Sequence, residues 1–330
     1  MKGLRMTVKY VGRRVVRLTA QGALLGGRAV VAGARIGIRR SGTMPAMPEL
    51  PPARLLDLPG RGEVWVADSG SPRPGAPTLV LFHGLAATSY LNWFSALDAL
   101  RADYRVVMFD QRWHGRGIVS DRFRLEDCAD DAAAVLDALR IPEAVIVGYS
   151  MGGALAQLFW RRHPHRTAGL VLASTAGYWC GNLGDRVFYP VLGWANGPLS
   201  RRTQARVAGL AASLADPGTP ADDLSAWAWG EFRGVSPWSL PEALGALGSF
   251  DARPWLGEVD VPTAVVVTAR DRAIPTSRQR ELFEAIPGAS AFEAPGGHTS
   301  VIFDVERWRP VLLAAIAEVT GGVTVPAEVG

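Results

Sequence analysis

The sequence predicts an α/β fold, with a mostly parallel sheet that carries helices on both faces. Short, almost continuously apolar runs alternate with helical stretches, and short loops join them. Near-continuous hydrophobicity is what a strand needs when it is buried on both faces. The chain has 330 residues, of which 48% are hydrophobic and 20% are charged. This composition argues against disorder over the whole chain, and the length is enough for one large core, or for one core with an inserted subdomain.

The expected strands each end in a short loop. They are residues 63–67, 78–82, 105–109, 143–147, 170–173 and 263–268. The expected helices have apolar residues at helical spacing. They are residues 125–139, 151–162 and 307–319. Because strands and helices alternate along the chain, the strands are expected to run parallel.

The predicted core covers residues 49–175 and 256–320, and residues 176–255 interrupt it. This interruption is rich in Gly, Pro, Ser and Trp and breaks the alternation of strands and helices. We interpret it as a helical cap over the edge where the strands end, since ligands bind at that edge of open α/β sheets. An irregular helical layer is the alternative. Residues 1–48 are expected to form a basic arm and residues 321–330 a loose tail.

The strongest motif is Gly148-Tyr149-Ser150-Met151-Gly152, which follows one expected strand and opens the next helix. A serine on such a sharp turn has a strained backbone, so the residues two before and two after it must be small. The turn lifts the hydroxyl out of the sheet and directs the helix N-terminus at the reaction centre. A phosphate-binding loop is the alternative, but the sequence contains neither a GKS/T nor a GxGxxG motif.

A serine hydroxyl needs an adjacent base to act as a nucleophile, and the chain contains five histidines. His298 lies in a Gly-rich turn just before the last expected helix, where a loop could deliver it to the end of the sheet. His163 and His165 lie at a charged helix end and are expected to face solvent. His83 follows a strand and is expected to be structural.

The base needs a carboxylate that fixes its tautomer and stabilises the imidazolium. Asp271 follows the expected strand 263–268 and precedes His298 by 27 residues. Asp304 is a weaker candidate, which we expect to cap a helix or face solvent. The sequence therefore predicts Ser150 as nucleophile, His298 as base and Asp271 as the acid that orients the base.

A tetrahedral intermediate carries an oxyanion that needs two preorganised N–H donors. We expect these donors to be the backbone N–H groups of Met151 and Leu85, the latter following His83-Gly84. The neighbouring residues are expected to support the substrate or the loop structure. They are His83, Gly84, Gly148, Tyr149 and Gly152.

The segments HGLA, FDQRWHGRG, GYSMGG, ARDRAIP and GGHTS occur in this order. Over residues 53–319 the chain resembles the α/β-hydrolase superfamily, in particular its capped esterases, haloperoxidase-like members and carbon–carbon-bond hydrolases. The resemblance implies an eight-stranded sheet and the order Ser, Asp, His for the triad. The family's dehalogenases and most of its epoxide hydrolases have Asp where Ser150 stands, which argues against both. Asp110 begins a loop that is mainly structural in the family, although Trp113 and His114 depart from its usual pattern.

These observations favour a serine hydrolase that acts on a carboxylic ester with an apolar moiety. A carbon–carbon-bond hydrolase, an acyltransferase, a lyase and a cofactor-free perhydrolase could use the same triad. A non-catalytic binding protein is the third class.

No metal or cofactor is expected, because the sequence has no Cys/His cluster. Cys128 and Cys180 are far apart, which favours a reducing compartment over a disulfide framework. The expected partner is a small molecule, and the oligomeric state is not predicted.

The net charge of +4 hides an asymmetry. Residues 1–48 contain ten basic and no acidic residues, whereas the rest has 25 basic and 31 acidic residues. The excess of basic residues therefore does not indicate nucleic-acid binding by the core.

Between residues 14 and 39 the polar positions fall within an arc of roughly 60° on a helix, as in helices at anionic membrane surfaces. A cytoplasmic enzyme with peripheral membrane contact is expected. The alternatives are a helix packed on the domain, a disordered leader or an export signal.

Overall fold

The computed structural model describes residues 49–180, 227–228, 230–231 and 240–321. The predicted basic arm, most of the predicted cap and residues 322–330 of the tail lie outside the described residues. Among the described residues, no helix is both long and apolar enough to cross a bilayer.

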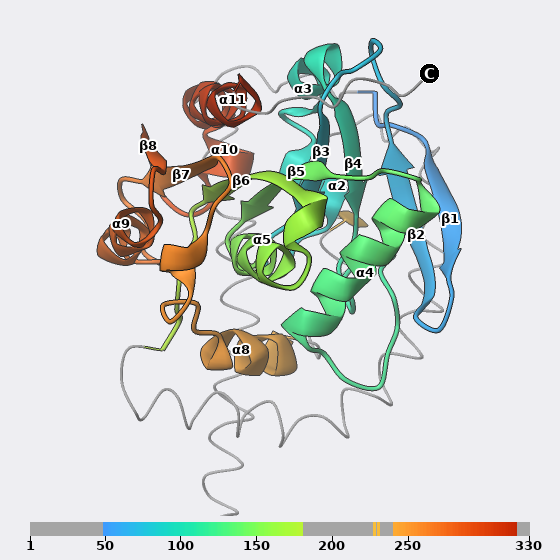
Figure 1. Ribbon diagram of the computed structural model, residues 1–330, viewed down its shortest axis with the longest axis horizontal. Helices are drawn as coiled ribbons and strands as arrows, with labels where there is room; N and C mark the ends of the chain where they lie inside the picture. The colour runs from blue at the N-terminus through green and yellow to red at the C-terminus, as the bar shows by residue number, and fades with distance from the viewer. Residues whose placement is uncertain (1–48, 181–226, 229, 232–239, 322–330) are drawn as a thin grey trace, which may run out of the picture. The chain divides into compact units, whose positions relative to one another are not determined.

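An eight-stranded sheet forms the centre of the described structure, in the order β1-β2-β4-β3-β5-β6-β7-β8 (Figure 1). The strands are β1 (Ala53–Leu58), β2 (Gly62–Asp68), β3 (Thr78–Phe82), β4 (Arg105–Phe109), β5 (Ala144–Tyr149), β6 (Thr167–Ala173), β7 (Thr263–Thr268) and β8 (Ser290–Ala294). β2 pairs antiparallel with β1 and β4, and all other pairs are parallel. The predicted mostly parallel α/β sheet is confirmed.

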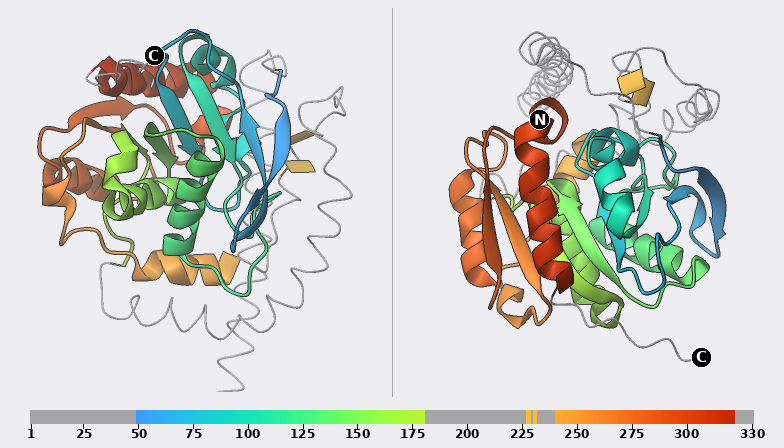
Figure 2. Two further views of the ribbon diagram at one scale, coloured as in Figure 1. Left: turned by 45° about the vertical axis from the view of Figure 1, so that its right-hand side comes forward. Right: turned by 90° about the horizontal axis from the view of Figure 1, so that it is seen from above.

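Two layers of helices cover the sheet (Figure 2). The helices are α2 (Ser89–Trp93), α3 (Leu97–Asp103), α4 (Leu125–Ala138), α5 (Met151–Arg162), α8 (Leu240–Ser249), α9 (Thr276–Ala285), α10 (Ser300–Phe303) and α11 (Val305–Gly321). α4, α5, α8 and α9 contribute to one hydrophobic cluster, and α2, α3, α10 and α11 contribute to the other. α8 lies within the predicted cap, and the other helices belong to the predicted core.

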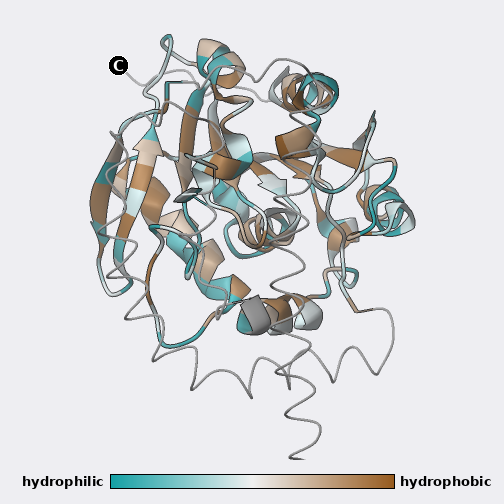
Figure 3. Ribbon diagram, turned by 180° about the vertical axis from the view of Figure 1, so that it is seen from behind, coloured by the Kyte–Doolittle hydropathy of each residue, from teal (hydrophilic) through white to brown (hydrophobic). Residues whose placement is uncertain are grey.

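The alternation of side chains along β5 explains why both faces must be covered. Ile146 belongs to the cluster under α4 and α5, whereas Val145 and Val147 belong to the cluster under α11. All three are buried, and each contributes about 1.5–3 kcal/mol of hydrophobic stabilisation. The central strands are accordingly mostly brown in Figure 3, while the outer helices also carry hydrophilic residues.

The boundaries differ from the sequence-based expectation where polar or small residues continue a strand. β5 runs on to Tyr149, past the glycine that ended the apolar run, because it pairs with β6 up to Ala173. The outer strands β1 and β8 were not predicted. Both contain exposed and half-buried positions, and each has a neighbouring strand on one side only.

Candidate active site

Ser150 lies at the sharp turn between β5 and α5, with a φ of 54°, a conformation that costs a non-glycine residue energy. Its backbone N–H donates to the carbonyl of Ala173 at 2.9 Å, and its carbonyl accepts from Oγ1 of Thr175 at 2.8 Å. A Cβ atom on Gly152 would lie 2.1 Å from the Phe82 carbonyl oxygen. The turn is therefore held by β6 and the residues that follow it, and it lies too close to β3 to tolerate a side chain at Gly152.

The three predicted triad residues come together at one edge of the sheet. Ser150 follows β5, Asp271 follows β7 and His298 follows β8, and these strands are parallel. Nε2 of His298 lies 2.9 Å from Oγ of Ser150, and Nδ1 lies 2.7 Å from Oδ2 of Asp271. Because a carboxylate only accepts, Nδ1 carries the imidazole proton and Nε2 accepts from the serine hydroxyl.

The Asp271 carboxylate is completely buried and has a contact on each oxygen. Oδ1 accepts from the backbone N–H groups of Ala273 and Ile274, at 2.8 and 2.9 Å. Oδ2 accepts from His298 and also from the side-chain amide of Gln279, at 3.1 Å. A buried charge is tolerated only with such partners. Sequence reasoning missed Gln279, although its position on the buried face of α9 was a usable signal.

The turn that carries His298 is fixed by its neighbours. Gly296 has a φ of 101°, and a Cβ there would lie 2.2 Å from Oγ of Ser300. That same hydroxyl accepts from the Gly297 N–H at 3.0 Å. On the inner side, the buried ring of Tyr149 lies 5.5 Å from the imidazole. Burial raises the pKa of the Tyr149 phenol above its ordinary value, so it stays neutral.

The loop after β3 lies directly beside the nucleophile. A Cβ atom on Gly84 would lie 3.4 Å from Cβ of Ser150. The Gly84 N–H donates to Oδ1 of Asn92 at 3.0 Å, which ties this loop to α2. Among the loop, turn and cap hydrogen bonds of the described residues, none is donated by the backbone N–H group of Leu85 or of Met151. Their role as oxyanion donors stays a prediction.

His83 has both ring nitrogens engaged away from Ser150. Nδ1 lies 2.9 Å from the carbonyl of Gly84, and Nε2 accepts from the Gln111 N–H at 2.8 Å. Burial lowers the pKa of His83 below its ordinary value, although Asp110 opposes this shift. These contacts support a structural role and leave His83 no lone pair with which to act as a base.

The other candidates take no part in the triad contacts. His165 is exposed, as expected. The expectation that His163 faces solvent is wrong, because its Nε2 lies 2.9 Å from Oδ1 of Asp130 and the side chain is only 23% exposed. Asp304 lies 3.8 Å from Arg307 on the next helix.

Asp110, which follows β4, connects the first residue of α2 to the loop after β4. Its Oδ1 accepts from both the N–H and the hydroxyl of Ser89, and its Oδ2 accepts from the N–H of Arg116. Burial alone would raise the pKa of Asp110, but the Arg116 guanidinium and His83 hold it below its ordinary value. The geometry agrees with the structural role expected for this residue.

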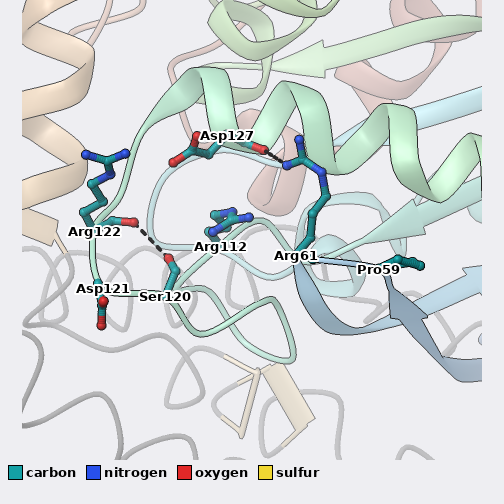
Figure 4. A pocket seen from close by; sticks show the side chains of 8 residues that line it. Pro59, Arg61, Arg112, Ser120, Asp121, Arg122 and Asp127 are labelled. Atoms are coloured by element: carbon teal, nitrogen blue, oxygen red, sulfur yellow. Dashed lines mark hydrogen bonds between the residues drawn. The ribbon is translucent and has the colours of Figure 1, made fainter.

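A surface pocket of about 520 Å³ lies elsewhere on the molecule (Figure 4). It is lined by Pro59, Gly60, Arg61, Arg112, Ser120, Asp121, Arg122 and Asp127. Two of its arginines, Arg61 and Arg112, share the buried carboxylate of Asp131. None of the predicted site residues lines this pocket, so it is not the site of the serine chemistry.

The sheet, the turn at Ser150 and the adjacent His–Asp pair define the class of α/β hydrolases. Residues 77–206 match the family model described as the alpha/beta hydrolase fold. The chain is 30% identical over 256 residues to a poly(3-hydroxyalkanoate) depolymerase of Ectopseudomonas oleovorans, covering 73% of this chain and 86% of the relative. The chain therefore belongs to the α/β-hydrolase family and is a hydrolase of this fold.

Two further proteins are similar to this chain. Epoxide hydrolase B of Mycobacterium tuberculosis (strain ATCC 25618 / H37Rv) is 37% identical over 122 residues, covering 36% of this chain and 34% of the relative. The crystal structure of the enol-lactonase from Burkholderia xenovorans LB400 superposes with a TM-score of 0.63 at 24% identity, covering 80% of this chain and all of that chain. The second similarity concerns the fold alone.

Proposed function

We propose that the protein is a serine hydrolase of carboxylic esters, with Ser150 as nucleophile, His298 as base and Asp271 as the orienting acid. The observation that carries this proposal is the unbroken chain of contacts from Oγ of Ser150 through the imidazole to Oδ2 of Asp271, at 2.9 and 2.7 Å. A hydroxyl and a base within hydrogen-bond reach, with the base oriented by a third group, is the arrangement that activates serine.

The reaction proceeds by acyl transfer. Ser150 attacks the ester carbonyl while Nε2 of His298 takes the hydroxyl proton, and the N–H groups of Leu85 and Met151 stabilise the oxyanion. Collapse of the tetrahedral intermediate breaks the ester bond, and the imidazolium returns the proton to the leaving alcohol. Water then attacks the acyl-enzyme with His298 again as base, which releases the acid and restores Ser150.

An apolar acyl or alcohol moiety is the proposed substrate feature. The similarity to a poly(3-hydroxyalkanoate) depolymerase supports an ester-type substrate. The tryptophans of the proposed cap are weaker support, because two of them are engaged in packing. Trp179 lies 5.9 Å from Phe250, and Trp227 lies 5.3 Å from Phe94.

Covalent labelling and turnover test the proposal together. A fluorophosphonate should label the wild type, and Ser150→Ala should abolish both labelling and hydrolysis of p-nitrophenyl esters graded by acyl length. Ser71→Ala is the matched control, because Ser71 is exposed and precedes β3, at the opposite edge of the sheet. Turnover of vinylogous diketones without ester hydrolysis would identify a carbon–carbon-bond hydrolase instead. A fully active Ser150→Ala variant would refute the proposal.

We also propose that residues 176–255 form a cap on the core formed by residues 49–175 and 256–320. The buried contact between Glu231, in the proposed cap, and Thr88, in the core, supports this division.

For the basic arm we propose peripheral contact of residues 14–39 with an anionic membrane from the cytoplasmic side. Cell fractionation of the full chain and of a version without residues 1–45 tests this contact. Equal partitioning of the two proteins into the soluble fraction would refute it.

A further inference from the structure

We propose that Gln279 is a positioning residue that holds the Asp271 carboxylate in the orientation which His298 requires. This inference rests on the proposed serine hydrolase function. Gln279 does not touch the reacting atoms. It acts through Asp271, to which its side-chain amide donates at 3.1 Å.

Three contacts use both donor hydrogens and one acceptor site of the Gln279 amide. Nε2 donates to Oδ2 of Asp271 at 3.1 Å and to the carbonyl of Ile274 at 2.8 Å, while Oε1 accepts from the N–H of Thr268 at 2.8 Å. The orientation of the amide is determined by these partners, because one is a donor and two are acceptors. The side chain therefore joins the end of β7 to both sides of the turn that carries Asp271.

The position of Gln279 on α9 is one where an apolar residue would be expected. Gln279, Leu282 and Ile286 are all buried and are spaced at three and four residues, so they share the inner face of the helix and its end. Gln279 is the polar member of this set, and it is completely buried. Burying an amide is costly without partners, so its presence is explained by the groups that it binds.

The contact falls on the oxygen that matters for catalysis. Oδ2 of Asp271 accepts from both Gln279 and His298, whereas Oδ1 is held by two backbone N–H groups. Without the amide, the imidazole would be the remaining partner of Oδ2 among the described residues. The position of this oxygen would then be less firmly fixed. The imidazolium formed during proton transfer would then lose part of its stabilisation, which lowers kcat.

Gln279→Leu removes all three contacts while keeping the side chain similar in size. We expect kcat to fall roughly 10- to 100-fold, as for loss of one hydrogen bond to a charged group. The KM should stay within about threefold, because a completely buried side chain does not contact substrate. Thermal unfolding reports whether the fold is intact in the variant. The rate of fluorophosphonate labelling should fall together with kcat, because His298 activates Ser150 in both reactions.

Gln279→Glu separates positioning from simple support of the fold. An introduced carboxyl can still accept from Thr268, but it can donate to Asp271 only while it is protonated. Asp271 and, beyond it, His298 are the titratable groups in this hydrogen-bonded chain. The ratio of the variant's kcat to the wild-type kcat should therefore fall as the pH rises, by roughly tenfold across the assay range. A ratio that does not change with pH would overturn the proposal.

Gln157→Leu is the matched control. Gln157 is also a completely buried glutamine on a helix, and its amide donates to the carbonyls of Gly153 and Ala176. Because Gln157 makes two contacts rather than three and its Oε1 has no partner among the described residues, we expect a smaller loss of stability than for Gln279→Leu, with kcat within roughly threefold of the wild type. Wild-type kcat in a folded Gln279→Leu variant would overturn the role of Gln279 alone. A wild-type protein without turnover or label would instead overturn the proposed function and this role with it.

Discussion

The guanidinium of Arg116 and the carboxylate of Glu231 form a buried, two-point ion pair, with Nη2–Oε1 and Nη1–Oε2 distances of 2.6 and 3.1 Å. Oε2 of Glu231 also accepts from the hydroxyl of Thr88, which caps α2. Glu231 lies in the proposed cap, whereas Thr88 follows the loop that carries Leu85. A single carboxylate thus connects the cap segment to the loop beside the nucleophile.

Breaking this ion pair should destabilise the protein strongly. Glu231→Gln removes the two-point partner of the buried Arg116 charge and leaves it only the Asp110 carboxylate, at 3.8 Å, among the described residues. We expect a loss of about 3 kcal/mol of unfolding free energy, the lower end of the range for a broken buried ion pair. Glu293→Gln is the control, because the Arg280–Glu293 pair is more than half exposed on both sides and contributes at most about 1 kcal/mol. Urea unfolding of both variants measures the difference, and equal losses would contradict the prediction.

The turn at Ser150 should not tolerate even a methyl group at position 152. Gly152→Ala places a Cβ atom 2.1 Å from the carbonyl oxygen of Phe82, a backbone atom that cannot move aside without distorting β3. We expect a loss of at least about 2 kcal/mol of stability and no labelling of Ser150. Gly257→Ala is the control, since a Cβ there has no neighbour within 4 Å. A stable, reactive Gly152→Ala protein would show that the turn is not constrained as described.

Asn92 should control the oxyanion loop through its bond to the Gly84 N–H. In Asn92→Ala the loop loses this acceptor, so the N–H group of Leu85 is no longer held in place. We expect kcat to fall roughly tenfold or more, in line with the effect of disturbing one oxyanion donor. Steady-state kinetics with a p-nitrophenyl ester measures it. Tyr104→Phe, which removes a contact with Thr320 on α11, should leave kcat unchanged.

His114 should make stability depend on pH. Burial, and after it the neighbouring His83, lower the pKa of this histidine to about 3. Nδ1 lies 2.9 Å from the carbonyl of Arg112, and Nε2 has no partner among the described residues. The folded protein therefore keeps the ring neutral at pH values where the unfolded chain, with a pKa of about 6.5, binds a proton.

The sign of the effect follows from the protons bound. Between pH 6.5 and 3 the unfolded state binds more protons, so the unfolding free energy decreases as the pH falls through this range. Between pH 6.5 and 5 the loss from His114 should be about 2 kcal/mol. His114→Asn cannot take up this proton, and its unfolding free energy should fall less steeply over the same range. Parallel pH dependences of the two proteins in urea unfolding would refute the prediction.

The sequence was most informative where burial is greatest. β3, β4 and β7 begin and end at the predicted residues, because a strand covered on both faces leaves a continuous apolar run. The outer strands β1 and β8 lack that run, since one edge of each has no neighbouring strand and part of each is exposed. Their pairing depends on β2 and β7, which lie elsewhere in the chain.

The sequence by itself determined the α/β class, the serine turn and the residue types of the site, because these depend on local patterns and on chemistry that few side chains can perform. Only the tertiary structure decided which groups meet. It brought Gln279, on a face of α9 that the local pattern marks as apolar, against Asp271. It also brought Glu231 against Arg116, which lies in a distant segment of the chain. Such contacts depend on how helices pack against the sheet, and no short stretch of sequence encodes that packing.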